Sequence, residues 1–265
     1  FVGMTNNQDS GRGHLALTRG ENVAVLGGCN LFTGLPSREL ERIAAASSTS
    51  IVRGGTDVFR EGDPSTGLWV LAHGRTKLYH SSADGRSQIV NFAMDNSLLE
   101  LGSALDGRAH SMTATALENS VLLLIPRRIL LDLNRRYDTV VQRTIDELCS
   151  DLRQRDIVST IAALKDARGT VVCAILQLAW QYGEPMAGGV RIGYQLSRQD
   201  LADRAGIRIE TVIRILSDLR HENAIITKNH MIEITDLGAL QRSVACHECL
   251  LDCSVFARSK NPIRT

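Results

Sequence analysis

The 265-residue chain has no long apolar run, almost no net charge and no catalytic motif. No apolar stretch reaches the roughly 18 residues that a membrane-spanning helix needs, so we expect no membrane partner. The formal net charge is +1, so no global basic field indicates a nucleic acid, although a local basic surface stays open. A Gly-rich phosphate loop, a nucleophile motif and a paired-acid site are all absent from the sequence, which therefore does not predict an enzyme.

The sequence also lacks a secretion signal. Residues 1–10 are polar and contain no apolar core. We therefore expect a cytoplasmic protein in a reducing environment, where structural disulfides are unusual and metal or redox chemistry is more relevant to cysteines.

Half of the six cysteines stand close together near the end of the chain. Cys246, Cys249 and Cys253 have the spacing C-x2-C-x3-C. Thiolates grouped in this way hold a metal or a cluster, or respond to redox state. Four interpretations stay open: an iron–sulfur cluster, a zinc ion with a fourth ligand such as His247, a thiol–disulfide switch without metal, and inert cysteines.

Composition and periodicity divide the chain into five segments. Residues 1–27 are polar and Gly-rich and are expected to be flexible. Residues 28–126 contain short β-type runs separated by Gly and Asp turns, which is typical of a small antiparallel barrel or roll. Residues 127–167 are helical, 168–240 are helical with a short β ending, and 241–265 form a cysteine-rich tail. The predicted fold class is α+β.

Local signals place several elements within these segments. Ser37 is the expected N-cap of a short helix that begins near Pro36. Six strands are expected in the roll, at residues 51–52, 57–59, 68–72, 76–79, 88–92 and 121–125.

An apolar heptad pattern runs through the segment 127–167. Val141, Ile145, Leu148 and Leu152 recur at 4-3-4 spacing. The pattern fits either an amphipathic helix packed on its own domain or a two-stranded dimer coil. We favour the dimer, because the pattern lies between a β domain and a separate helical one.

The strongest motif covers Ser197 to His221. Two helices joined around Gly206 have the layout of a helix-turn-helix, and residues 224–234 are expected to form a two-stranded wing that turns at Asn229. Eight apolar side chains can form its core: Leu201, Ala202, Ala205, Ile207, Val212, Ile215, Leu216 and Leu219.

Two charged residues of the second helix are candidates for base recognition. Glu210 and Arg214 are four residues apart and lie on one helical face. A carboxylate can accept a hydrogen bond from cytosine, and a guanidinium can donate two to guanine. The alternative is an ordinary surface ion pair.

Residues 28–240 resemble the CRP/FNR family of transcription regulators in their order of domains. The run Cys29–Ser37 is similar to the start of the family's effector domain, and the run Arg208–Leu216 is similar to its recognition helix. The resemblance implies a cyclic-nucleotide-binding-like roll, a homodimer, palindromic DNA with TGA-type half-sites and RNA polymerase as a partner. It implies base reading by Glu210 and Arg214. The residues that complete the implied DNA-binding set are Arg208, Ile209 and Ile213.

The segment that holds a cyclic nucleotide in similar proteins differs in this chain. Glu100 and Ser111 remain, but His110 stands in place of the phosphate-binding arginine and Leu99 in place of a glycine. Losing the guanidinium removes a bidentate phosphate contact, so we expect no cyclic nucleotide. Another small-molecule effector in the roll, or haem through one of its histidines, stays an alternative. The histidines considered are His73, His80 and His110.

The resemblance also gives the cysteines a role. The FNR branch holds an iron–sulfur cluster on N-terminal cysteines, whereas Cys29 is alone there. A minority of similar regulators use three C-terminal cysteines for a [4Fe-4S] cluster and complete it with a ligand from the dimer helix. For this chain the implied ligands are Cys246, Cys249 and Cys253. The candidates for the fourth ligand are Cys149, then Asp151 and Asp156, and after them Cys29 and Cys173.

The resemblance thus predicts a regulator that senses oxygen, nitric oxide or redox state. A rival class is a metal-cluster protein whose helix-turn-helix makes only protein contacts.

Overall fold

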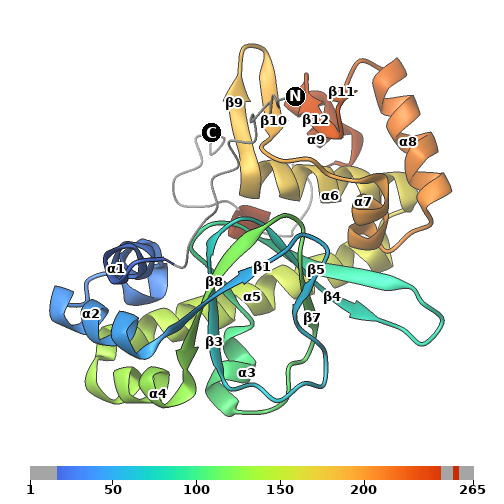
Figure 1. The fold of residues 1–265 in the computed structure, drawn as a ribbon. Coiled ribbons are helices and arrows are strands. Elements are labelled where there is room, and N and C mark those ends of the chain that lie inside the picture. Colours follow the sequence, from blue (N-terminus) through green and yellow to red (C-terminus); the bar gives the residue numbers. More distant parts are fainter. Residues whose placement is uncertain (1–16, 246–252, 257–265) are drawn as a thin grey trace, which may run out of the picture.

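A β-roll, a long helix and a helical domain with a small sheet follow one another along the chain (Figure 1). This arrangement confirms the predicted α+β fold class. The structure is a computed structural model that describes residues 17–245 and 253–256. Cys246 and Cys249 lie outside the described residues.

The roll consists of two antiparallel four-stranded sheets, in the strand orders β1-β8-β3-β6 and β2-β7-β4-β5. Gly67 is required where β3 pairs with β8, because a Cβ atom there would lie 2.1 Å from the carbonyl oxygen of Ile125. The strands of the roll are β1 Ser48–Val52, β2 Asp57–Phe59, β3 Gly67–His73, β4 Thr76–Ser81, β5 Ser87–Ala93, β6 Ser97–Leu99, β7 Thr113–Ala116 and β8 Ser120–Pro126.

Nine α-helices are described within residues 17–245. None of them is both long and apolar enough to cross a membrane. Their bounds are α1 Arg19–Gly28, α2 Ser37–Ala46, α3 Leu101–Asp106, α4 Arg127–Arg136, α5 Asp138–Leu164, α6 Ala167–Tyr182, α7 Arg198–Ala205, α8 Ile209–His221 and α9 Leu237–Ser243.

The N-terminal part is more ordered than the composition suggests. The segment 1–27 is expected to be flexible, yet α1 begins at Arg19. Thr18 caps this helix, and Glu21 completes a reciprocal capping box, which satisfies backbone donors at the helix start. The N-cap of α2 is Pro36, without a side-chain cap, so the prediction of Ser37 as N-cap is wrong.

The helical segment expected over residues 127–167 is divided in two. Tyr137 has an extended backbone (φ −133°, ψ 102°) and separates α4 from α5. Leu130 and Leu133 of α4 are fully buried against the roll. The long helix therefore begins only at Asp138.

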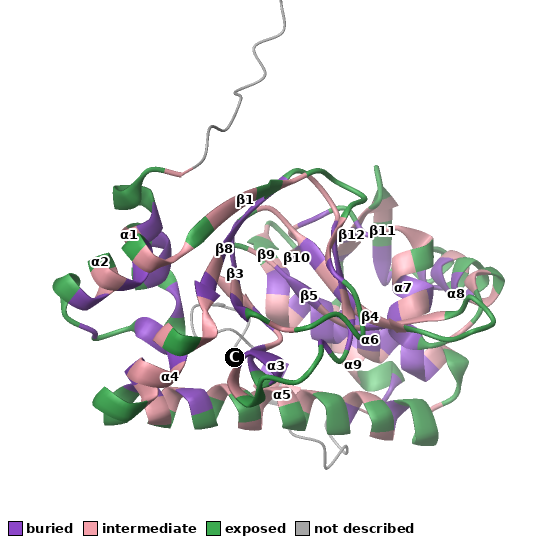
Figure 2. Cartoon of the chain, turned by 60° about the horizontal axis from the view of Figure 1, so that its bottom comes forward, coloured by how far each residue is buried: buried purple, intermediate pink, exposed green. Residues whose placement is uncertain are grey.

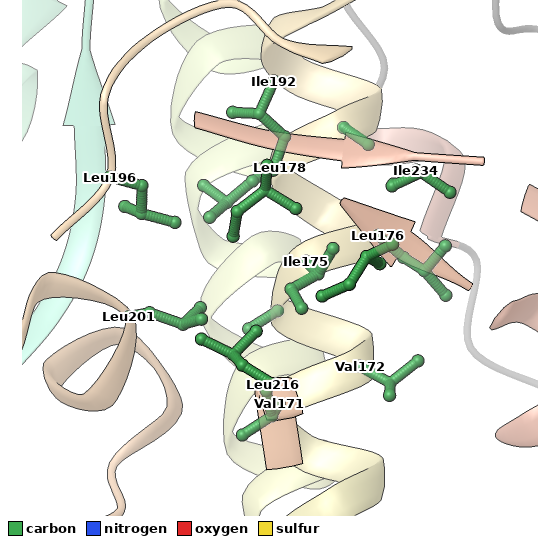
Figure 3. Close-up of a cluster of buried hydrophobic side chains, with 14 of the residues drawn as sticks. Val171, Val172, Ile175, Leu176, Leu178, Ile192, Leu196, Leu201, Leu216 and Ile234 are labelled. Carbon is green, nitrogen blue, oxygen red and sulfur yellow. The ribbon is translucent and has the colours of Figure 1, made fainter. Parts of the chain in front are cut away.

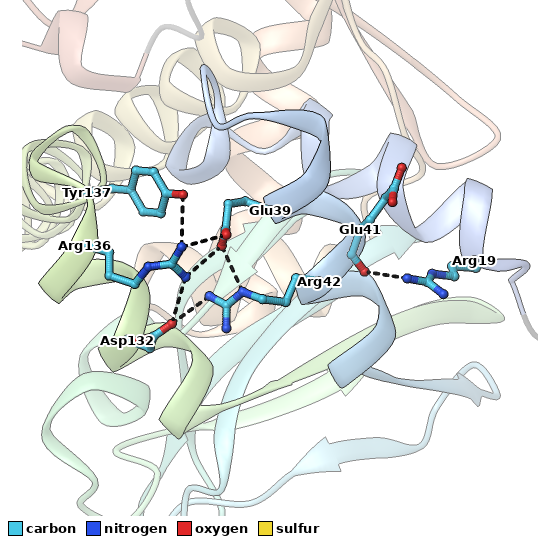
Figure 4. Close-up of polar contacts among 7 residues, drawn as sticks. All are labelled: Arg19, Glu39, Glu41, Arg42, Asp132, Arg136 and Tyr137. Carbon is cyan, nitrogen blue, oxygen red and sulfur yellow. Dashed lines mark hydrogen bonds and ion pairs between the residues drawn. The ribbon is translucent and has the colours of Figure 1, made fainter.

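A charged network fixes α2 to α4 (Figure 4). The Glu39 carboxylate accepts hydrogen bonds from Arg136 (2.8 Å) and Arg42 (2.9 Å), and Arg42 also contacts Asp132 (2.7 Å). The hydrogen bond from Arg136 is the main cause that lowers the pKa of Glu39. The network anchors the base of α5, because α4 leads directly into that helix.

Helix α5 runs along the molecule and has both buried and exposed apolar residues (Figure 2). Ile157 and Ile161 are buried. By contrast, Ile145, Leu148 and Leu152 are 48%, 37% and 59% exposed. The heptad stripe therefore faces away from the chain's own domains along this stretch.

The C-terminal domain is built around α6, which lies at the centre of its hydrophobic core (Figure 3). Helices α7 and α8 cover one side of α6, and a four-stranded sheet, in the order β11-β12-β10-β9, covers another. The strands are β9 Gly183–Met186, β10 Gly189–Ile192, β11 Ile225–Lys228 and β12 Met231–Ile234. Residues 186–189 form the turn of the β9–β10 hairpin.

Candidate functional site

Capping residues define both ends of the first helix of the predicted helix-turn-helix. The Ser197 side chain accepts a hydrogen bond from the backbone of Asp200 and starts α7. Gly206 ends α7 in the left-handed conformation (φ 68°), which a side chain rarely adopts. Helix α8 begins three residues later at Ile209.

Helix α8 has one buried and one exposed face. Seven of the eight predicted core residues are buried, and Ile207 packs against the same cluster while partly exposed. On the outer face Arg208, Glu210 and Arg214 are exposed, and Ile213 is 49% exposed. Ile209 differs from them, because it is half-buried and packs against the domain core.

Glu210 and Arg214 present their charges to solvent. Within residues 17–245 no ion pair joins these two side chains, so the surface-pair alternative does not describe them. An exposed carboxylate and an exposed guanidinium one turn apart can reach adjacent base edges in a major groove. Ile213 beside them offers a methyl-bearing surface of the kind that contacts thymine.

The wing follows α8 as predicted. Lys228 of β11 pairs with Met231 of β12, and the turn uses Asn229 (φ 49°) and His230 (φ 61°). Lys228 and His230 are exposed at its tip. A hairpin with a lysine at its tip suits contact with phosphates beside the recognition helix.

The roll contains a polar cluster around Glu100, at the position of the expected nucleotide pocket. His110 Nδ1 lies 2.5 Å from Glu100 Oε2, the Ser103 hydroxyl donates to Glu100 Oε1 (2.9 Å), and the Ser111 backbone N–H donates to the same oxygen. His110 is 5% exposed and stacks on Phe59 with ring centroids 3.8 Å apart. The sequence does not single out Ser103, although its i+3 spacing from Glu100 at the start of α3 signals the contact.

Little space remains beside this cluster. A cavity of about 30 Å³, roughly the volume of one water molecule, lies between the roll and α5 and is lined by Glu100, Val90 and Asp151, among others. Burial raises the pKa of Asp151. Glu100, the carboxylate that a ribose would need, already accepts hydrogen bonds from the Ser103 hydroxyl and the Ser111 amide.

The three histidines considered for haem are in separate places. His73 contacts Asp95 (3.3 Å) and His80 contacts Glu61 (3.3 Å), both on the surface, whereas His110 is buried with Glu100. Each imidazole thus has a different carboxylate as neighbour.

The cysteines differ in accessibility. Cys29 is fully buried in the roll core, its thiol donates to the Val25 carbonyl (3.3 Å), and burial raises its pKa to about 12. A thiol with that pKa stays protonated and is a poor metal ligand. Cys149 and Asp151 of α5 are half-buried, and Asp156 is exposed.

Cys253 is the one member of the cysteine triad within the described residues. It lies in a 3₁₀ turn, Cys253–Phe256, that packs on α5 and α6. Phe256 is buried against Ile157 and Ile161. The residues that line the small cavity beside the turn are Ile161, Lys165, Cys173, Leu176, Gln177, Trp180, Val244 and Cys253.

Cys253 and Cys173 line the same small cavity. Cys149, Asp151 and Asp156 do not line this cavity. Cys173 is half-buried and packs against the core cluster of the C-terminal domain. Among residues 17–245 and 253–256, no group of three or more His, Cys, Asp or Glu side chains is arranged to hold a metal ion.

Two protein-family models match the chain. The cyclic nucleotide-binding domain matches residues 51–137, and the Crp-like helix-turn-helix domain matches residues 171–243. Together they cover the roll with α4 and most of the C-terminal domain.

Curated relatives match over most of their length. The chain is 27% identical over 214 residues to the cyclic AMP receptor protein of Thermus thermophilus. The matched region covers 81% of this chain and 96% of that protein. It is 22% identical over 189 residues to the fumarate and nitrate reduction regulatory protein of Vibrio cholerae, covering 71% and 75% of the two chains.

Among solved structures, FixK2 from Bradyrhizobium japonicum has a TM-score of 0.67 at 22% identity. The matched region covers 74% of this chain and 96% of the FixK2 chain. A mutant of CooA from Carboxydothermus hydrogenoformans also has a TM-score of 0.67, at 14% identity. At these identities the likeness shows the fold.

Proposed function

Because the chain belongs to the CRP/FNR family of DNA-binding transcription regulators, we propose that it is a cytoplasmic homodimer that binds palindromic TGA-type sites and senses oxygen, nitric oxide or redox state. The proposed sensor is an iron–sulfur cluster on Cys246, Cys249 and Cys253. RNA polymerase is the proposed protein partner.

The observation that carries the proposal for DNA is the exposed outer face of α8. Glu210, Ile213 and Arg214 point away from the domain core and lack an ion pair between them. Side chains exposed in this way on one face of a helix are available for base edges. Arg208 at the N-cap adds a positive charge where the helix enters the groove.

The exposed stripe on α5 supports the homodimer. Ile145, Leu148 and Leu152 expose apolar surface at heptad spacing, and burying it against a second copy would form a coiled-coil seam. A two-fold dimer in turn requires a DNA site with two half-sites about one helical turn apart.

Two features support an iron–sulfur cluster in place of a ligand in the roll. The Glu100 carboxylate already has hydrogen-bond partners within the chain, and the cavity beside it has a volume of only about 30 Å³. The donor set of the tail is rich in thiols, which are the usual ligands of iron–sulfur clusters. Cys253 packs against α5, so a cluster there would be coupled to the dimer helix.

The fourth ligand is proposed to come from α5, with Cys149 first and Asp151 or Asp156 as alternatives. Cys173, a lower-ranked candidate from the sequence, gains support because it lines the same cavity as Cys253. When bound, the cluster would supply a group that oxygen or nitric oxide can attack.

The DNA proposal is tested by titrating a labelled TGA-type palindrome, with a duplex of scrambled half-sites as control. The expected result is tighter binding to the palindrome by about a thousandfold or more at physiological salt. Equal affinity for both duplexes would refute sequence-specific reading and favour the rival class, a metal-cluster protein that contacts only proteins.

The cluster proposal is tested by anaerobic purification with a visible spectrum and iron and sulfide analysis. We expect about four irons and four sulfides per chain, lost in Cys253→Ala and retained in the control Cys29→Ala, whose thiol is buried in the roll. A colourless, iron-free wild-type protein that still responds to the signal would refute the cluster. Bound zinc, or a disulfide that forms without metal, would establish one of the alternatives.

A further inference from the structure

Strand β5 of the roll contributes two side chains to the hydrophobic core of the DNA-binding domain. Ile89 and Phe92 of β5 are 0% and 3% exposed, and both belong to the cluster formed by α6, α7 and α8. The Tyr182 hydroxyl of α6 also donates to the Phe92 carbonyl. The recognition unit is therefore packed on the roll in addition to being linked to it through α5.

A β-bulge interrupts β5 at this interface. Leu78 of β4 faces Asn91 and the next residue, Tyr79, faces Ile89, so Val90 is an extra residue without a partner across the ladder. Such a bulge leaves backbone groups outside the regular hydrogen-bond pattern and bends the strand.

The side chain of Arg204, from α7, occupies this bulge. Its Nη1 donates to the carbonyls of Val90 (2.8 Å) and Ile89 (3.4 Å), and its Nη2 donates to Gln177 Oε1 (3.1 Å). Arg204 is 4% exposed, and these acceptors are neutral. A guanidinium without a carboxylate partner is costly to bury, so its position depends on these three acceptors together.

Weaker contacts surround it. Lys77 of β4 forms an ion pair with Asp200 of α7 (2.9 Å), with side chains 23% and 15% exposed, and Gln88 donates to the Arg204 carbonyl (3.2 Å). All of these contacts cross from the β4–β5 hairpin to α7, the helix that directly precedes the recognition helix.

The bulge also faces the roll interior. Val90 and Asn91 line the small cavity between the roll and α5, together with Glu100 and Asp151. The bulge thus lines a cavity together with α5 on one side and accepts hydrogen bonds from Arg204 on the other.

We propose that Arg204 is a positioning residue for DNA recognition, which fixes the angle between the α7–α8 unit and the dimer helix and so sets the half-site spacing that the dimer accepts. This rests on the proposed function as a homodimer on palindromic DNA. Arg204 contacts no base in this account, so its loss should change spacing preference more than the affinity of one recognition helix for one half-site.

The test measures binding to palindromes whose half-site spacing varies in single base-pair steps around one helical turn, about 10 base pairs, together with a duplex that has one half-site. Wild-type protein is expected to prefer one spacing by about tenfold or more over its neighbours, a coupling typical of linked sites. Arg204→Met should flatten this preference to about twofold, with half-site affinity changed by less than about threefold.

Arg168→Met is the matched control, because Arg168 pairs with Glu222 on the surface of the same domain (2.6 Å) and does not reach the roll. It should keep the wild-type profile. A folded Arg204→Met protein with the wild-type spacing preference would overturn the proposal, as would a wild-type protein that binds all spacings equally.

If Arg204→Met does not fold, Lys77→Met decides, since it removes one interface contact from the roll side and should broaden the profile in part. A wild-type profile in Lys77→Met would then count against the proposal. A wild-type protein that binds no palindrome at all refutes the proposed function instead, so the two failures are distinct.

Discussion

The cavity of the roll and the outer face of α8 are both rich in polar residues, but their side chains find partners in different places. In the roll, Glu100 is bound by His110, Ser103 and the Ser111 amide, and little space remains. On α8, Glu210 and Arg214 are exposed and do not pair with each other. Buried polar groups are almost always hydrogen-bonded, so one region is satisfied within the chain and the other is ready for an external partner.

The same contrast occurs within α5. Ile157 and Ile161 bury their side chains against the tail turn, whereas Ile145, Leu148 and Leu152 leave theirs in solvent. An exposed apolar stripe at heptad spacing indicates an interface. Substitution of an inward-facing residue should therefore affect folding, whereas substitution of an outward-facing one should affect binding.

The largest effect is expected from Leu152→Glu. Leu152 is 59% exposed in the single chain, so the fold should tolerate the change, but a carboxylate in each half of a dimer seam should separate the protomers. Affinity for a two-half-site palindrome should fall at least about a hundredfold, because the second half-site no longer binds intramolecularly. Sedimentation and DNA titration measure both effects. The matched change Leu164→Glu, at a 77% exposed position outside the stripe, should leave the dimer intact. A dimeric Leu152→Glu protein would contradict the seam.

A smaller effect, on folding, is expected from Glu100→Ala. The change leaves His110, Ser103 and the Ser111 amide without their acceptor, which should lower the free energy of unfolding by about 3 kcal/mol. Denaturant unfolding measures it. Glu61→Ala, which removes the exposed partner of His80, is the control and should cost less than about 1 kcal/mol. Equal losses in the two variants would show that the roll cluster is not structural.

The smallest effect is expected from Glu39→Gln and depends on pH. The hydrogen bond from Arg136 lowers the pKa of Glu39 in the folded protein below its ordinary value of 4.5. The ionised carboxylate therefore stabilises the fold at pH values above 4.5. This contribution is lost as the pH falls through the lowered pKa. At pH 7 the variant should lose about 1–2 kcal/mol of unfolding free energy, and the difference from wild type should disappear at low pH. A difference that stays constant down to pH 2 would contradict the assignment.

The sequence predicted the recognition unit well because its signals are local. Ser197 and Gly206 define the ends of α7, and the apolar periodicity of α8 assigns its buried face. Six of the eight strands of the roll were predicted for the same reason, since Gly and Asp turns separate them, whereas the short strands β6 and β7 were missed. Helix α1 was missed, although Thr18 and Glu21 form a recognisable capping box at its start.

The remaining features depend on contacts between distant segments. Strand β9 has the sequence Gly-Glu-Pro-Met, which has little β propensity, and it forms only as an edge beside β10. Arg204 looks like a surface residue of α7, and its burial follows from a bulge in β5 more than 100 residues away. Cys253 and Cys173 line one cavity only because the turn Cys253–Phe256 packs on α6 in the folded chain.

The central claim is that the outer face of α8 reads DNA. Fluorescence anisotropy with a TGA-type palindrome and with its scrambled counterpart, over a series of salt concentrations, compares Arg214→Ala with the control Arg168→Ala. Arg214→Ala should weaken palindrome binding by roughly 5- to 150-fold for each half-site and change scrambled-duplex binding little, whereas Arg168→Ala should behave as wild type. Unchanged palindrome affinity in Arg214→Ala would contradict the claim.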